Sequence, residues 1–427
     1  MKAITSRARF GSHLGLERIT LVCKELGDPQ TALRFIHVAG TNGKGSVCAF
    51  LASSLAAAGY KVGRFTSPHL VSYRERIAIN GVPIDDEDLS TLGAAVDEAC
   101  RAVEESYPDL GAVTEFEYAT ALAFCYFQRA GVDVVVLETG LGGRLDATNV
   151  VTPDLCVITP IGYDHMDRLG YSLKEIAWEK AGIIKPGVPV VVAYQRAEAY
   201  HVLISVAHDR KAPIALLAEW EHQALGWDLA GGKLLLPEIS PTPFAIRLLG
   251  DHQLQNAATA ALALHQLTAL GWQISAEHIR VGLSHTEWPG RLEVVSTEPL
   301  GVLDGAHNED GLKTLAAGLQ HLGQGLDRRW TFVFGMLFNK DLALLDLLLP
   351  LAERFVFTQA ESARLAPMPP EAMAAYVQAK QAPAEVRLPA GEALRTALST
   401  PPICVCGSLY LIGNIKRDLA GLGIVTQ

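Results

Sequence analysis

Short apolar runs alternate with longer amphipathic segments along the first part of this chain. The apolar runs lie at 35–38, 61–65, 132–137, 155–159 and 188–192, and each has the length of a buried strand. The segment 47–58 is rich in alanine and leucine and has the pattern of a helix that ends near Gly59. Strands that alternate with helices predict an α/β fold with a mostly parallel sheet flanked by helices.

The pattern changes further along the chain. Between residues 195 and 250 it is shorter and more strand-like, and a helix-like segment follows at 255–270. After the turn signal Trp288-Pro289-Gly290, a second α/β alternation begins, with strand-like runs at 302–304, 331–334, 354–358 and 403–406. We therefore expect a first domain over 1–287 and a smaller second domain over 288–427.

Composition agrees with two globular domains. The chain has 427 residues, of which 49% are hydrophobic, and ~150 residues is the usual size of one domain. Its net charge is −10, from 36 Lys and Arg against 46 Asp and Glu. No basic block is present, which argues against a nucleic-acid partner. An acidic chain that binds an anion must concentrate its few cations at one place, which draws attention to Lys44, Lys180 and Arg291.

The cysteines and the N-terminal segment bear on the compartment. None of the seven cysteines forms a Cys-x-x-Cys pair, and several lie in apolar runs. The first ten residues carry charges without the apolar core of a signal peptide, and the most apolar later run, 342–351, is interrupted by Asp346 and Pro350. We expect a cytoplasmic protein with reduced cysteines and no membrane partner.

A glycine-rich turn joins the first apolar run to the helix-like segment that follows it. Its sequence is Gly40-Thr-Asn-Gly-Lys-Gly-Ser46. Glycines let several backbone N–H groups face one anion, the helix adds the positive end of its dipole, and Lys44 adds a charge. The turn predicts a nucleotide-phosphate site with Ser46 facing Mg²⁺, although Gly45 stands where the usual pattern has a hydroxyl residue. A structural turn with a surface lysine is the alternative.

Further polar residues follow other predicted strands. In parallel sheets, ligands bind beyond the carboxyl ends of the strands. Glu138 ends the run 132–137 and is the leading candidate for a Mg²⁺ ligand. Ser67 and the pair Asp164-His165 follow neighbouring runs and could converge on the same ion. Because Mg²⁺ prefers oxygen ligands, coordination chemistry alone does not favour His165 over Asp164.

Motifs spread over the whole chain carry a specific resemblance. They are the turn at 40–46, Thr-Ser-Pro-His-Leu at 66–70, Glu-Thr-Gly-Leu-Gly-Gly-Arg-Leu-Asp-Ala-Thr-Asn at 138–149, Asp-His at 164–165, Glu-Lys-Ala-Gly-Ile at 179–183, Pro-Gly-Arg at 289–291 and Asp-Gly-Ala-His-Asn at 304–308, within a match that runs from Leu14 to Gly413. Together they resemble the folylpolyglutamate synthase/dihydrofolate synthase family of the Mur ligase superfamily. The resemblance implies a P-loop domain of the Mur ligase type, a C-terminal Rossmann-like domain, and an ATP-dependent amide ligase whose nucleotide lies between them.

The resemblance also implies roles for single residues. ATP would be held by Gly43, Lys44, Gly45 and Ser46, and from the hinge and the second domain by Asn256, Arg291 and Asp304. Magnesium, two ions in all, would be held with the help of Ser67, Glu138 and His165, so that His165 is chosen by analogy. Lys180 matches a lysine that CO2 carbamylates to N6-carboxylysine, and Lys44, Lys180 and His165 would be the catalytic residues. An ordinary lysine at a helix end is the alternative for Lys180.

Substrate contacts follow from the same resemblance. The pteroate-binding segments of bifunctional members align with Thr114, Glu115, Phe116 and Glu117, and with Leu145, Asp146 and Ala147. His307 and Ser408 match positions implicated in binding the incoming glutamate. Phe116 could stack on the pterin or aryl ring, and core packing is its alternative.

The implied reaction activates a carboxylate with ATP to an acyl phosphate, which the amine of L-glutamate attacks. Dihydropteroate and reduced folates would be the acceptors, and we expect a monomer whose partners are small molecules. A Mur-type peptidoglycan ligase is a competing interpretation, but the segment before Gly40 is shorter than the ~50 residues of a free-standing domain. A regulatory P-loop NTPase that acts through partner binding is the other alternative. A dinucleotide dehydrogenase is disfavoured because Leu145 stands where a third glycine belongs.

Overall fold

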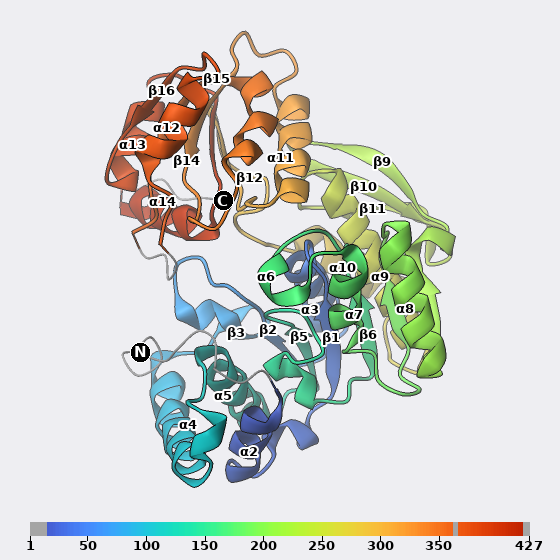
Figure 1. Cartoon of the computed structure of the whole chain (residues 1–427). Coiled ribbons are helices and arrows are strands. Elements are labelled where there is room, and N and C mark those ends of the chain that lie inside the picture. The colour runs from blue at the N-terminus through green and yellow to red at the C-terminus, as the bar shows by residue number, and fades with distance from the viewer. Residues whose placement is uncertain (1–14, 362–365, 422–427) are drawn as a thin grey trace.

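The computed structural model describes residues 15–361 and 366–421. The charged N-terminal segment and Leu14, at the start of the motif match, lie outside these ranges. The two larger of the three sheets are each covered by helices and lie one above the other, with residues beyond 290 in the upper body of Figure 1. Within the described residues, no helix is both long enough and apolar enough to span a bilayer.

The larger sheet is mostly parallel, as the alternating pattern predicted. Its spatial order is β4 (Val82–Pro83), β3 (Ile77–Ile79), β2 (Val62–Phe65), β5 (Val134–Glu138), β1 (Phe35–Ala39), β6 (Leu155–Ile158), β7 (Val190–Val192) and β8 (Ile214–Leu216). All neighbours from β2 to β8 pair in parallel, whereas β3 and β4 form an antiparallel extension. Every residue of β1 and β5 is buried, and all of them except His37 and the terminal Glu138 are apolar, as expected for strands at the centre of the sheet.

Helices cover both faces of this sheet. One face packs against α3 (Lys44–Ala57), α9 (Asp251–Ala269) and α10 (Ala276–His285). The other face packs against α2 (Glu17–Glu25), α4 (Asp86–Ser106) and α5 (Glu115–Ala130) near β2 and β5, and against α7 (Leu173–Ala181) and α8 (Ala197–Asp209) near β6 and β7. The short α6 (Met166–Leu169) lies between β6 and α7 in the chain.

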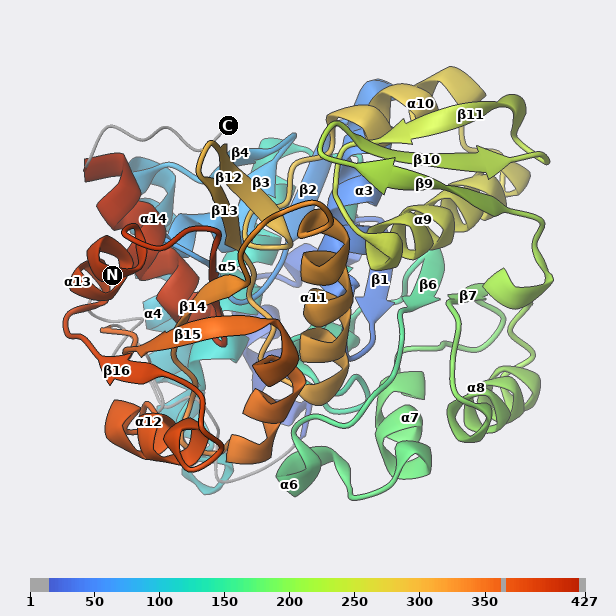
Figure 2. The same cartoon turned by 90° about the horizontal axis from the view of Figure 1, so that it is seen from above.

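The strand-like region before residue 250 forms a separate antiparallel sheet. Its strands are β9 (Gln223–Asp228), β10 (Gly231–Leu236) and β11 (Ser240–Ile246), and they lie over α9 and α10 (Figure 2). Leu234, Phe244 and Ile246 join the same apolar cluster as α9. This small sheet therefore holds the outer side of α9, whose N-terminal turn reaches the glycine-rich turn at 40–46 through Gln253.

The second α/β body has the order β12 (Glu293–Thr297), β13 (Leu300–Leu303), β17 (Ile403–Cys406), β14 (Trp330–Phe334), β15 (Ala352–Phe357) and β16 (Ala384–Val386), with only β12 antiparallel to its neighbour. Helices α11 (Glu309–Leu322) and α12 (Pro370–Gln378) pack on one face, and α13 (Ala390–Ala397) and α14 (Leu409–Gly421) on the other. Short 3-10 helices complete the described fold at Pro29–Ala32, Tyr73–Arg76, Pro108–Leu110, Ala147–Val150, Leu217–Glu219, Leu342–Leu347 and Leu349–Leu351.

Candidate active site

A cavity of about 780 Å³ lies where the carboxyl ends of the two sheets face each other. The eight-stranded sheet lines it with residues that follow β1, β2, β5 and β6. The six-stranded sheet lines it with residues that follow β13, β14 and β17. All site candidates taken from the sequence line it: Gly43, Lys44, Gly45, Ser46, Ser67, Thr114, Glu115, Phe116, Glu117, Glu138, Leu145, Asp146, Ala147, His165, Lys180, Asn256, Arg291, Asp304, His307 and Ser408. The fold thus brings them together, and their individual roles stay predictions.

The glycine-rich turn at 40–46, the predicted site of the nucleotide phosphates and called the phosphate loop below, has the shape of an anion site. Gly43 precedes α3 with a φ of 85°, a left-handed conformation that glycine adopts without strain. The Lys44 ammonium donates to the carbonyls of Gly40 and Thr41, at 3.2 Å each. Behind the loop, the buried Ser46 hydroxyl accepts a hydrogen bond from Gln253 of α9 at 3.2 Å. The loop is therefore ordered by its own lysine and by α9.

Lys180 of α7 points to the same loop. Its Nζ donates to the Gly40 carbonyl at 2.6 Å, and the residue is only 4% exposed. Burial, together with the nearby charge of Lys44, lowers the pKa of Lys180 to about 7. A neutral amine, the nucleophile that carbamylation requires, is therefore accessible near neutral pH.

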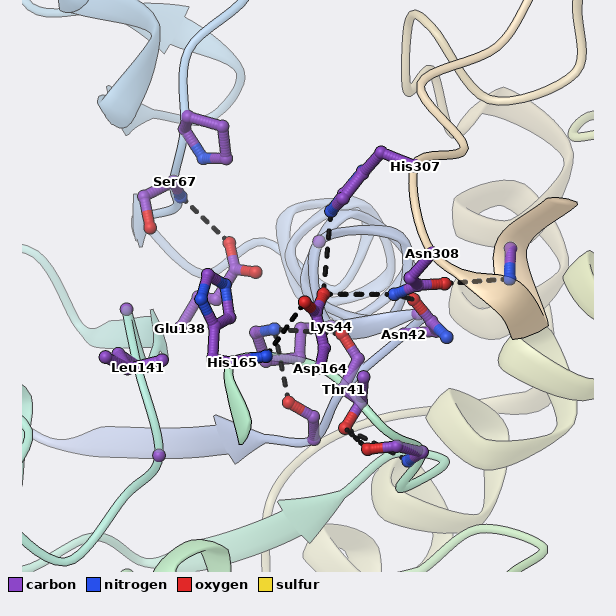
Figure 3. A pocket seen from close by; sticks show the side chains of 18 of the residues that line it. Thr41, Asn42, Lys44, Ser67, Glu138, Leu141, Asp164, His165, His307 and Asn308 are labelled. Carbon is purple, nitrogen blue, oxygen red and sulfur yellow. Dashed lines mark hydrogen bonds and ion pairs between the residues drawn. The ribbon is translucent and has the colours of Figure 1, made fainter. Parts of the chain in front are cut away.

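Glu138 is a buried carboxylate at the end of β5. Its Oε2 accepts the backbone N–H of Ser67 at 2.9 Å, as Figure 3 shows. Burial raises its pKa, while the charges of Lys44, Arg291 and Arg64 act in the opposite direction. In the part of the chain that the structure describes, Glu138 forms no salt bridge. A buried carboxylate without an ion pair favours a cation as its partner.

His165 offers a neutral ring to the same region. It precedes α6 with a φ of 50°, and burial lowers its pKa to about 4, which leaves a nitrogen lone pair free for a metal. No group of three or more His, Cys, Asp or Glu residues in the described ranges could form a metal site by itself. Mg²⁺ usually binds few protein ligands and completes its coordination with water and substrate phosphates. The hydroxyl of Ser67, the carboxylate of Glu138 and the imidazole of His165 fit this pattern.

Asp164 is held by the second domain. Its carboxylate accepts hydrogen bonds from Lys340 at 2.8 Å and from Asn308 at 3.1 Å, and it lies 3.6 Å from the ring of His307 (Figure 3). Burial alone would raise its pKa, but the hydrogen bond and charge of His307, with His165 and Lys340, hold it well below its usual range. Asn308 also donates to Asn42 at 3.1 Å. Asp164, weighed as a metal ligand from the sequence, therefore joins the two sides of the cavity in this structure.

The first predicted pteroate-binding segment, 114–117, lies at the start of helix α5. The Thr114 hydroxyl caps the helix, and the Glu117 carboxylate accepts from the Thr114 backbone at 2.7 Å. Buried Arg18 donates from Nε to both oxygens of Glu117 at 3.1 Å. Glu115 pairs with Arg76 at 3.2 Å, and both side chains are buried. The arginines also line the cavity; the sequence offered no spacing that pairs them with these carboxylates.

The other folate candidates shape the cavity wall. The centroid of the Phe116 ring lies 5.7 Å from that of the Phe65 ring. The Phe116 ring also packs against Gly140, where an added Cβ would lie 2.5 Å from Cζ of Phe116. Asp146 accepts the N–H groups of Gly140 at 2.9 Å and Leu141 at 2.8 Å. Phe116 thus has both a packing contact and a cavity face, while Asp146 fixes the backbone of its loop.

The Glu117–Arg18 pair allows a stability test. Glu117→Ala leaves a buried guanidinium without its carboxylate and removes the capping contact of α5. We expect a loss of about 3–5 kcal/mol in the free energy of unfolding, measured by urea denaturation. The matched control is Glu287→Ala, whose pair with Arg247 is 66% exposed on the glutamate side, with an expected loss of at most about 1 kcal/mol. Equal losses would contradict the importance of burial.

Residues of the second domain complete the wall. Asp304, after β13, accepts the N–H groups of Leu292 at 2.6 Å and Ala306 at 2.7 Å. Burial raises its pKa, and the charge of Arg291 opposes this. His307 is held by the Gly305 carbonyl at 2.8 Å. The backbone that carries these side chains is therefore ordered at the cavity.

Comparisons with known proteins identify the family of this chain. A family model described as the Mur ligase middle domain matches residues 38–264, and one described as the C-terminal domain of dihydrofolate synthetase matches residues 293–418. The dihydrofolate synthase/folylpolyglutamate synthase of Bacillus subtilis is 44% identical over 345 residues, which are 79% of each chain.

Solved structures give the same result. Mycobacterium tuberculosis folylpolyglutamate synthase complexed with ADP and AMPPCP matches with a TM-score of 0.88 and 31% identity, over 100% of this chain and 98% of that one. A folylpolyglutamate synthase complex with AMPPCP and folate matches with a TM-score of 0.84 and 32% identity, over 98% of each chain. The chain therefore belongs to the dihydrofolate synthase/folylpolyglutamate synthase family, whose members are ATP-dependent ligases that add glutamate to folates.

Proposed function

We propose that this enzyme is bifunctional: it joins L-glutamate to dihydropteroate and extends the glutamate chain of reduced folates. The observation that carries the proposal is one cavity that contains the phosphate loop, both folate segments and the glutamate candidates His307 and Ser408. The relative bound to AMPPCP and folate supports ATP and a folate as the substrates of this chain as well.

The proposed chemistry begins at the phosphate loop. Backbone N–H groups at 43–46 bind the phosphates of ATP, and Lys44 exchanges the carbonyls of Gly40 and Thr41 for phosphate oxygens. Arg291 approaches the transferring phosphoryl group from the second domain. The acceptor's carboxylate attacks this group to form an acyl phosphate and ADP, and the glutamate amine then displaces phosphate.

Ser67, Glu138 and His165 are the residues that would hold Mg²⁺. When bound, the ion neutralises charge on the phosphates. A carbamate on Lys180 would supply an anionic group for a second ion. Its supports are the lowered pKa of Lys180 and its contact with the loop carbonyl of Gly40.

The two acceptor substrates are proposed to lie on the side of the cavity formed by 114–117 and 145–147. Incoming glutamate lies on the opposite side, near His307 and Ser408, and Asn256 and Asp304 contact ATP. We place the domain division at 1–287 and 288–427, so that the site lies between the two domains. Because both domains of one chain line the cavity, a monomer suffices for catalysis.

The test is ATP consumption by the purified enzyme with dihydropteroate or tetrahydrofolate, each with and without L-glutamate. We expect ADP release only when an acceptor and glutamate are both present, and a product heavier by one glutamyl unit with either acceptor. Turnover of one acceptor alone would reject bifunctionality. ATP hydrolysis that is indifferent to acceptor and glutamate would instead identify a regulatory NTPase.

A further inference from the structure

The glycine at position 45, directly after Lys44, is explained by a close side-chain contact and not by its backbone conformation. Gly45 lies in the first turn of α3 with a helical backbone, so its conformation does not require glycine. A Cβ at this position would lie 2.5 Å from Cζ2 and 2.9 Å from Cε2 of Trp288. The indole ring of Trp288 therefore occupies the space that a hydroxyl residue fills in the usual P-loop pattern.

Trp288 is held from a second element of the first domain. The guanidinium carbon of Arg64, from β2, lies 5.0 Å from the centroid of the Trp288 ring, within range of a cation–π contact. Among the described residues, Arg64 Nε has no hydrogen-bond acceptor. The ring thus contacts the phosphate loop and a strand of the larger sheet.

The segment after Trp288 leads directly to Arg291. The Gly290 carbonyl accepts the N–H of Gly305 at 2.9 Å, which ties the segment to the loop after β13 of the second domain. A Cβ at Gly305 would lie 2.6 Å from Nη1 of Arg291, so the guanidinium packs against the Gly305 backbone. Residues 288–291 are therefore fixed to the first domain at one end and to the second domain at the other.

We propose that Trp288 is a positioning residue that keeps the guanidinium of Arg291 correctly placed relative to the phosphate loop. The proposal rests on the roles assigned above to Arg291 and to residues 43–46. Arg291 belongs to a domain that must be placed against the loop, and a displacement of about 1 Å in a reacting group can cost about 100-fold in rate. Trp288 lies only three residues before Arg291 in the chain. The contact of its indole ring with Gly45 therefore fixes the position of Arg291 relative to the loop.

The first test compares single and double variants in steady-state kinetics. Trp288→Ala is expected to lower kcat by about 10- to 100-fold, with little change in KM for folate or glutamate. Trp288→Phe keeps a ring and is expected to retain most of the activity. In an Arg291→Ala background, Trp288→Ala is expected to have almost no further effect, because it acts through Arg291.

The second test uses the close approach itself. Gly45→Ala is expected to lower kcat because the new methyl group displaces the indole ring. The same change in a Trp288→Ala background is expected to cost nothing more, since the obstacle is gone. If Trp288→Ala fails to fold in a thermal-unfolding control, Gly45→Ala with and without Trp288→Phe decides the matter: partial restoration by Phe supports the proposal, and no restoration overturns it.

The outcomes separate this proposal from the proposed function. Normal turnover by Arg291→Ala would reject the role of Arg291, and with it both arguments. An impaired Arg291→Ala enzyme whose rate falls further, and multiplicatively, on adding Trp288→Ala would leave the function intact and overturn the positioning role. If the fold-losses in kcat of Gly45→Ala and Trp288→Ala multiplied in the double variant, the two residues would likewise not act through their contact.

Discussion

Replacing Lys44 with methionine is expected to lower kcat by about 100- to 1,000-fold, as does the loss of one preorganised group that stabilises a transition state. Methionine keeps the length and apolar stem of the side chain and removes its charge. In the structure, the ammonium donates to the loop carbonyls of Gly40 and Thr41, and its charge lowers the pKa of the buried Glu138 against the effect of burial. The charge that would balance the transferring phosphoryl group is thereby lost.

Binding and turnover should respond differently in this variant. The backbone N–H groups at 43–46 remain, so we expect the affinity for ATP, measured by calorimetry, to fall less than kcat. Lys61→Met is the control, because Lys61 is an exposed lysine that donates to the Ala130 carbonyl. Wild-type turnover by Lys44→Met would reject the assignment of the phosphate loop.

The sequence predicted the strands that carry the site because those strands are buried on both faces. Residues 134–137 are all apolar and lie at the centre of the sheet, and the polar residues Asp133 and Glu138 flank them. Glu138 is the last residue of β5, and it lines the cavity. Position at the end of a buried strand thus predicted that Glu138 and the loop at 40–46 lie at one edge of the sheet, and both line the cavity, while their roles stay predictions.

Contacts between distant segments could not be predicted in the same way. Arg18 meets Glu117, and Lys340 meets Asp164, across sequence separations of 99 and 176 residues. No local pattern marks an arginine or lysine as the partner of a particular carboxylate. The glycine at position 45 is a similar case, since its departure from the usual spacing was visible but its cause, the ring of Trp288, lies in the hinge.

Lys180→Ala is the other change with a large expected effect, and we expect a loss of activity of about 100-fold or more, comparable to that at Lys44. The native amine must be neutral to attack CO2. Its pKa is lowered from 10.5 to about 7, mainly by burial. As the pH falls below about 7, the ammonium form dominates and carbamylation is blocked, whereas the neutral fraction grows as the pH rises through this value.

The dependence on CO2 distinguishes a carbamate from an ordinary buried lysine. We expect enzyme held in CO2-free buffer at pH 6 to lose activity, to regain it with bicarbonate at pH 8, and to show a carbamate signal with ¹³C-labelled CO2. Lys174→Ala, on the exposed side of the same helix, should keep the full response. In Lys180→Ala, a small carboxylate such as acetate can enter the vacated space and restore part of the activity. Activity that is indifferent to CO2 at both pH values would show that the unmodified amine, through its bond to the Gly40 carbonyl, is the functional form.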